Sequence, residues 1–149
     1  MRNQIFVSYS HKDKKWLSRL QVHLAPLEQN GVVSVWDDTK IKPGTKWRDE
    51  IERALASAKA AILLVSADFL ASEFISKNEL PPLLAAAERD GALIIPVIVS
   101  ACRFLETASI AMFQAVNSPS QPLTGMGKDA QEEVFYEVSK AVENVPRNP

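Results

Sequence analysis

Residues 60–66 read Ala-Ala-Ile-Leu-Leu-Val-Ser (AAILLVS), and residues 93–99 read Leu-Ile-Ile-Pro-Val-Ile-Val (LIIPVIV). Both runs are apolar at successive positions, which is expected of central strands in a parallel sheet that helices cover on both faces. Pro96 has no backbone donor, so the second run is either near a sheet edge or locally irregular. These two stretches predict an α/β protein.

Strand-like and helix-like segments alternate on either side of these runs. The expected strands are 4–9 (QIFVSY) and 32–36 (VVSVW), and the expected helices are 13–29, 45–58, 68–90 and 128–145. Residues 101–123 have no clean period and are expected to hold a short helical piece near 107–113 and a short strand near 114–116. Such alternation implies right-handed βαβ units and a parallel sheet. Ligands then bind at the carboxyl ends of strands, near a topological switch point.

Composition excludes several classes of protein. The chain has 149 residues, of which 46% are hydrophobic and 23% charged, and this suits one soluble domain. We expect no membrane span and no signal peptide, because the longest apolar run is far shorter than the roughly 20 residues of a spanning helix. The 17 basic and 18 acidic residues nearly cancel, so bulk charge predicts no nucleic-acid or membrane partner. The single cysteine, Cys102, favours a cytoplasmic location.

Familiar catalytic and cofactor motifs are missing from the sequence. It contains no GxGxxG or GxxxxGK[ST] loop, no GxSxG elbow and no HExxH pair. One cysteine and two histidines are too few for most Cys or His metal sites, so we expect no metal and no resident cofactor. Asp37-Asp38, after the expected strand 32–36, leaves a minor hypothesis of a phospho-acceptor site that binds a divalent metal, as in receiver domains.

Four motifs in order resemble the Toll/interleukin-1 receptor (TIR) domain family. They are residues 5–13 (IFVSYSHKD), residues 36–44 (WDDTKIKPG), the AAILLVS strand, and residues 72–80 (SEFISKNEL). The second motif resembles the family's loop after the second strand, the BB loop. The resemblance covers residues 3–145 and implies a flavodoxin-like, open, mostly parallel five-stranded sheet with helices on both faces. We therefore expect a TIR domain over 1–145, with 146–149 a linker stub toward a sensor or oligomerisation domain.

The resemblance implies two classes of function. Many family members cleave NAD+ at the nicotinamide–ribose bond, with one glutamate that matches Glu79 here, and others are interaction modules that assemble with other TIR domains. In the enzymatic reading NAD+ is the substrate, and the products are nicotinamide with ADP-ribose or a cyclic ADP-ribose isomer. Such an enzyme is expected to act in antiphage defence, activated by self-association and by a fused or partner sensor domain. The alternative is a non-catalytic scaffold that binds other TIR domains through the BB-like loop (39–46) and the adjacent helices.

One carboxylate is sufficient for this chemistry. Nicotinamide departs neutral from a cationic pyridinium, so it needs no proton, whereas glycosidases use two carboxylates because their leaving groups do. The transition state resembles a ribosyl oxocarbenium ion, which a carboxylate beside the sugar can stabilise while it holds the ribose hydroxyls. Pro81-Pro82 predicts that the helix kinks or restarts next to Glu79, because proline removes a donor and restricts the preceding residue.

Other candidates for substrate contact lie in the first two loops and beside Glu79. They are Ser8, Tyr9, Ser10, His11, Trp36, Asp38, Trp47 and Phe74. Residues 8–11 could donate to ribose or phosphate or cap their loop, and Asp38 could bind a ribose hydroxyl or cap its own loop. Trp36 could pack in the core or line the pocket. We expect Trp47 to pack in the core. Phe74 could stack on nicotinamide or join the core. Many enzymatic relatives have Trp four residues before the glutamate, where this chain has Ile75.

Overall fold

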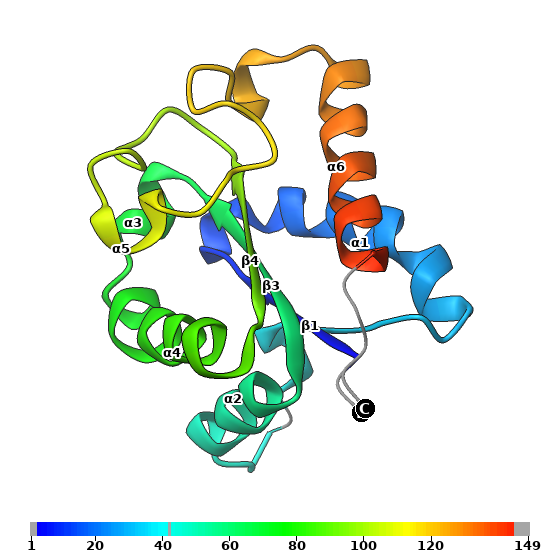
Figure 1. The fold of residues 1–149 in the computed structure, drawn as a ribbon, viewed down its shortest axis with the longest axis vertical. Coiled ribbons are helices and arrows are strands. Elements are labelled where there is room, and N and C mark those ends of the chain that lie inside the picture. The colour runs from blue at the N-terminus through cyan, green and yellow to red at the C-terminus, as the bar shows by residue number, and fades with distance from the viewer. Residues whose placement is uncertain (1–2, 42, 145–149) are drawn as a thin grey trace.

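The computed structural model describes residues 3–41 and 43–144 and contains one parallel sheet between two layers of helices (Figure 1). The strands are β1 (Gln4–Ser8), β2 (Ser34–Trp36), β3 (Ala58–Val65) and β4 (Leu93–Ile98), in the order β2-β1-β3-β4. The helices are α1 (Lys14–Gln29), α2 (Trp47–Ala56), α3 (Ala67–Ala71), α4 (Leu80–Asp90), α5 (Ala108–Ala111) and α6 (Lys128–Glu143). All three strand pairs are parallel, so the predicted α/β class and sheet type are confirmed.

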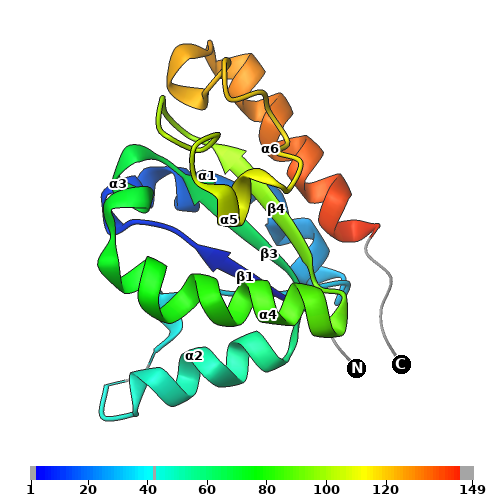
Figure 2. The ribbon, with the colours of Figure 1, turned by 60° about the vertical axis from the view of Figure 1, so that its left-hand side comes forward.

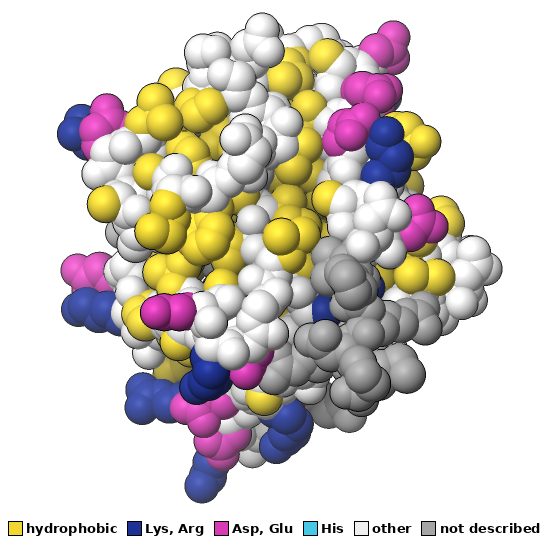
Figure 3. Space-filling model, in the orientation of Figure 1, with side chains coloured by type: hydrophobic (Ala, Val, Ile, Leu, Met, Phe, Trp, Pro, Cys, Tyr) yellow, Lys and Arg dark blue, Asp and Glu magenta, His cyan; other side chains and the backbone are white. Residues whose placement is uncertain are grey.

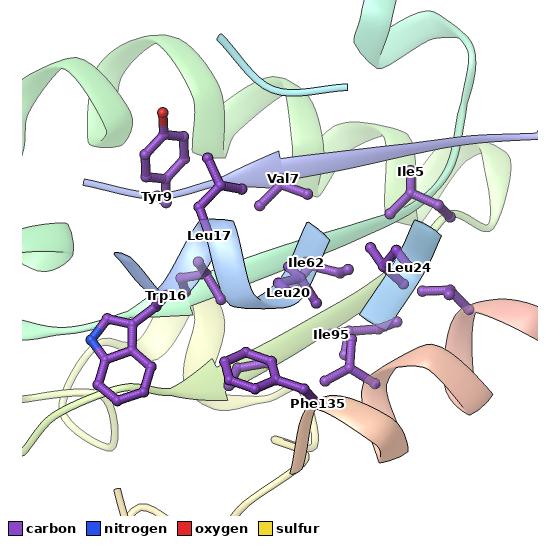
Figure 4. Packing of buried hydrophobic residues seen from close by; sticks show 14 of the residues in the cluster. Ile5, Val7, Tyr9, Trp16, Leu17, Leu20, Leu24, Ile62, Ile95 and Phe135 are labelled. Carbon is purple, nitrogen blue, oxygen red and sulfur yellow. The ribbon is translucent and has the colours of Figure 1, made fainter. Parts of the chain in front are cut away.

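Each face of the sheet has its own hydrophobic core, because successive side chains of a strand point to opposite faces. Ile5, Ile62 and Ile95 pack with α1 and α6 on one face, where Phe135 of α6 meets the sheet (Figure 4). Alternate positions, such as Leu63, belong to the second core with α2 and α4. Figure 2 shows α2 and α4 on one side of the sheet and α6 on the other. The doubly apolar runs of the sequence are thus explained by burial on both faces.

The described part of the chain has four strands where five were expected, and the sheet ends at β4. Where the fifth strand was expected, one backbone hydrogen bond of 2.9 Å joins Val116 N to Pro96 O. The side-chain amide of Asn117 then takes the place of a strand, since it accepts from Ile98 N and donates to Ile98 O, each at 2.9 Å. Pro96 lies on this edge strand, as its missing donor predicts.

The helical run through Glu79 is irregular, as the two prolines predict. A π-helical turn, Ile75–Glu79, precedes α4, and Leu80 N donates to Ile75 O five residues back. Pro81 and Pro82 have no donors, so the usual bonds to carbonyls four residues back are missing there. Turns of this type in helices are often found at functional sites.

The strand order creates a switch point beside β1. The chain crosses from β1 to β2 on one side and returns to β3 on the other, so the connections that follow β1 and β3 diverge. Ligands of open α/β sheets bind in the crevice at such a point. No helix within residues 3–41 and 43–144 is both long and apolar enough to cross a bilayer.

Candidate functional site

A cavity of about 370 Å³ opens beside the carboxyl end of β1. Three segments form its walls: the loop after β1, the start of the loop after β2, and the chain around the π-helical turn. The lining residues are Tyr9, Ser10, His11, Lys12, Asp38, Ser72, Phe74, Ile75 and Glu79. The cavity therefore lies where the strand order places a ligand site.

Glu79 is a buried carboxyl group in the wall of this cavity. Its residue is 6% exposed, and its Oε1 accepts a hydrogen bond of 2.6 Å from Ser8 Oγ. Burial raises the pKa of Glu79 from 4.5 to about 7; the Ser8 hydrogen bond opposes this rise, the charge of Asp38 adds to it, and His11 opposes it. A carboxyl group that titrates near neutral pH in a cavity is a candidate for catalysis.

Asp38 ties the first two loops together at the cavity. Its Oδ1 accepts a hydrogen bond of 2.8 Å from Tyr9 OH, and its Oδ2 contacts Nε2 of the exposed His11. Burial and the bond to Asp38 raise the pKa of Tyr9, so the phenol stays a donor. The neighbouring Asp37, and not Asp38, caps the loop, since Asp37 Oδ1 accepts from Thr39 N at 2.9 Å.

Most of the predicted contact residues meet at this cavity. Tyr9, Ser10, His11, Asp38 and Phe74 line it, and the buried Ser8 reaches it through the carboxylate of Glu79. Ser10 also has the alternative role considered for it, because its Oγ accepts a hydrogen bond from Lys12 N at 3.3 Å.

The two tryptophans among the predicted contacts, Trp36 and Trp47, are not among the residues that line the cavity. Trp36 is 9% exposed and stacks on Phe6 with ring centroids 5.1 Å apart, so it belongs to the core. Trp47 is 41% exposed, which makes the expectation of core packing wrong. The buried face of α2 begins one turn later, at Ile51, and Trp47 instead rests against Phe74 with ring centroids 5.2 Å apart.

Sequence reasoning gave no contact role to three cavity residues, Lys12, Ser72 and Ile75. The position of Lys12 in the first motif was the available signal, because it directly follows the predicted contacts. Ser72 accepts from Ile75 N at 3.2 Å and so starts the irregular helical run. Asp37 is buried and accepts from Gln21 Nε2 at 3.1 Å, and the described residues include no group of three or more His, Cys, Asp or Glu arranged to hold a metal.

Comparisons with known sequences identify the family of this chain. A model of the TIR domain family matches residues 5–127. The uncharacterized protein y4lF of Sinorhizobium fredii (strain NBRC 101917 / NGR234) is 32% identical over 138 residues, which are 93% of this chain and 42% of that protein. The chain therefore spans less than half the length of this curated relative.

Two solved structures share the fold. The TIR domain of the Toll-related receptor TRR-2 from Hydra magnipapillata superposes with a TM-score of 0.61 and 18% identity, covering 94% of this chain and 98% of that one. The TIR domains of the activated Roq1 resistosome, which directly recognizes the pathogen effector XopQ, give 0.59 and 16%, covering 97% of this chain and 85% of that one. At these identities the likeness concerns the fold alone.

Proposed function

Because this chain belongs to the TIR domain family, we propose that it is an NAD+ glycohydrolase with Glu79 as its catalytic carboxylate. One observation carries the proposal. A single carboxylate is buried in the wall of a 370 Å³ cavity at the switch point of the sheet, and a buried serine binds one of its oxygens. The proposed reaction needs one such carboxylate and no proton donor for its leaving group.

The proposed chemistry follows from the position of Glu79. The nicotinamide riboside half of NAD+ enters the cavity, and the bond between the ribose and the nicotinamide nitrogen breaks with its electron pair going to nitrogen. Nicotinamide leaves neutral, and the Glu79 carboxylate stabilises the positive charge left on the ribose. Water then adds and releases a proton to give ADP-ribose, or an internal nucleophile of the nucleotide closes a cyclic isomer. Only the ionised carboxylate can serve, and the pyridinium cation of the substrate favours that form.

The remaining cavity residues receive roles that suit their contacts. Phe74 is 41% exposed, which leaves part of its ring available for stacking on nicotinamide. Ser10 and His11 offer donors to ribose or phosphate, and Tyr9 and Asp38 hold the two loops together. Trp36 and Trp47 have no contact with substrate in this proposal.

The proposal includes activation by assembly and a role in bacterial antiphage defence in the cytoplasm. Residues 43–46, which directly precede α2, are exposed, so this segment is accessible to a second TIR domain. The greater length of the curated relative supports a further domain that clusters the TIR units. The presence of TIR domains in a resistosome that recognizes a pathogen effector supports a role in defence.

The test incubates NAD+ with protein that is crowded on a surface. Chromatography then measures the nicotinamide that is released. Glu79→Gln should lower the rate about 100- to 1,000-fold, because the charge beside the ribosyl cation is lost. Glu73→Gln is the matched control, since Glu73 belongs to the same helical run and its side chain is 84% exposed. Circular dichroism checks that each variant is folded. Equal release by wild type and Glu79→Gln would remove Glu79 from the mechanism.

A non-catalytic interaction module is the second candidate, and one surface favours it. Hydrophobic side chains gather over β4 and α5 (Figure 3), and Leu93 and Met112, which line a shared hollow there, are 43% and 76% exposed. Apolar patches of this kind often bind other proteins. Complete retention of NAD+ by a demonstrably assembled wild type would reject the enzyme and favour this function.

A further inference from the structure

The hydrogen bond between Ser8 and Glu79 joins a fixed point of the sheet to an irregular part of a helix. Ser8 is the last residue of β1, which pairs with β2 on one side and β3 on the other, and Ser8 itself is in register with Leu63. Glu79 is the last residue of the π-helical turn. The serine side chain is fully buried, and the two residues are 71 positions apart in the sequence.

This bond is also the contact that orients the carboxylate. Among the described residues, Ser8 is the one hydrogen-bond donor to the Glu79 side chain, through Oε1, and Oε2 accepts from none of them. A glutamate side chain has several rotatable bonds, so one buried donor greatly restricts the directions that its carboxylate can take. Glu79 lines the cavity, and a fixed Oε1 leaves Oε2 for a ligand.

We propose that Ser8 is a positioning residue for the reaction, because its buried hydroxyl holds one oxygen of Glu79 and so presents the other to the cavity in charged form. This inference rests on the proposed function of Glu79. The serine does not touch the substrate and acts through the carboxylate alone.

The hydrogen bond from Ser8 should have a measurable effect on the pKa of Glu79. Burial raises the pKa of Glu79 to about 7, and the donated hydrogen bond of Ser8 is the largest influence that lowers it. The other groups around the cavity are Asp38, which raises the pKa, His11, which lowers it, and Tyr9 and Lys12 in the same wall. Loss of the Ser8 hydroxyl should therefore move the titration of Glu79 to higher pH.

The first measurement is an NMR titration of the Glu79 side-chain carboxyl carbon, assigned by its disappearance in Glu79→Gln. In Ser8→Ala the midpoint should rise by about one pH unit, because one hydrogen bond to the charged form is lost. The thiol of Ser8→Cys is a weaker donor of similar size, so this variant should give an intermediate midpoint. It replaces Ser8→Ala in the test if Ser8→Ala does not fold. Ser66→Ala is the matched control, since Ser66 is a buried serine that donates to Asp13, and its midpoint should equal that of wild type.

The second measurement is the pH profile of nicotinamide release by crowded protein. A rise of one unit leaves about one carboxylate in eleven ionised at pH 7 in the free protein, so the kcat/KM of Ser8→Ala should fall about fivefold there and recover toward pH 9. A merely structural role of Ser8 would lower activity at all pH values alike.

The outcomes separate this inference from the proposed function. An unshifted midpoint in folded Ser8→Ala overturns the positioning role, whether or not the protein cleaves NAD+. A shifted midpoint together with no nicotinamide release from any assembled sample refutes the proposed function. The hydrogen bond between Ser8 and Glu79 then has no role in catalysis. A shifted midpoint and a shifted pH profile, both absent from Ser66→Ala, support the inference.

Discussion

Two buried pairs of a serine and an acid lie at the carboxyl ends of neighbouring strands, Ser8 with Glu79 and Ser66 with Asp13. Ser8 ends β1, and Ser66 directly follows β3. Each serine hydroxyl donates to the carboxylate of its partner, and the acids are 6% and 7% exposed. Burial raises the pKa of both acids, so their chemistry looks alike when each pair is taken alone.

The surroundings of the two pairs differ. Glu79 lines the cavity, whereas Asp13 is not among the residues that do. Ser66 Oγ also accepts from Phe69 N at 3.0 Å and so caps α3, while Asp13 directly precedes α1. The second pair thus joins the starts of two helices. Of the two buried acids with a raised pKa, Glu79 lines the cavity and Asp13 does not, and for this reason Glu79 is the one proposed as catalytic.

The largest expected effect is a contrast in activity between the two acids. Asp13→Asn should keep nicotinamide release within about threefold of wild type per folded molecule, whereas Glu79→Gln should lose about 100- to 1,000-fold. The reason is that Asp13 contacts Ser66 and not the cavity. Both variants go through the same chromatographic assay, at concentrations corrected for the folded fraction. Similar losses in both would show that the comparison between the pairs is wrong.

The next effect is the pH dependence of stability. The folded pKa of Glu79 is raised from 4.5 to about 7, so its protonated form is favoured in the fold, and its contribution to stability is complete below pH 4.5 and is lost as the pH rises through about 7. The free energy of unfolding should fall on the order of 3 kcal/mol across this range on account of Glu79. Urea denaturation from pH 4 to 8 measures it.

Glu79→Gln should remove most of this pH dependence and be more stable than wild type at pH 8. The pKa of Asp13 is also raised by burial, so part of the slope of the same sign should persist in that variant and become smaller when Asp13→Asn is added. Identical stability curves for wild type and Glu79→Gln would contradict the raised pKa.

The smallest effect concerns the capping serine. Ser66→Ala should lower the free energy of unfolding by about 1 kcal/mol, because α3 loses the cap on Phe69 N and Asp13 loses its donor. Nicotinamide release per folded molecule should not change. Ser66→Thr, which keeps a hydroxyl, should recover much of the stability in urea. A large loss of activity in a folded Ser66→Ala would show that the second pair also serves the cavity.

The sheet was predictable because its signals are local. Residues 60–66 and 93–99 are apolar at successive positions, and this alone indicates strands buried on both faces. The end of the sheet was not predictable in the same way. The fifth strand is replaced by the reach of one side chain, that of Asn117, to the backbone of Ile98, and no periodicity in the sequence reports such a contact.

Features of the candidate site that depend on a local motif or on a proline could be predicted from the sequence. Contacts between residues that are distant in the sequence could not. Pro81 and Pro82 indicated the irregular helix at Glu79, but the bond from Ser8 spans 71 positions and leaves no local trace. Trp36 and Trp47 are large and apolar, which suits a core or a pocket equally, so their burial depends on where β2 and α2 lie in the fold. The sequence left open whether Asp38 binds a ribose hydroxyl or caps its loop, and only the fold shows that the capping carboxylate is that of Asp37.

The outer edge of β4 has a consequence for behaviour in solution. Strand edges with open donors and acceptors can recruit strands of other molecules and lead to aggregation. Here Pro96 offers no donor and its carbonyl is bound by Val116, while Asn117 occupies both backbone groups of Ile98. Much of this edge is thereby closed to strand-by-strand polymerisation. Contacts between copies of this chain at high concentration should therefore form through side-chain surfaces and not by strand pairing at β4.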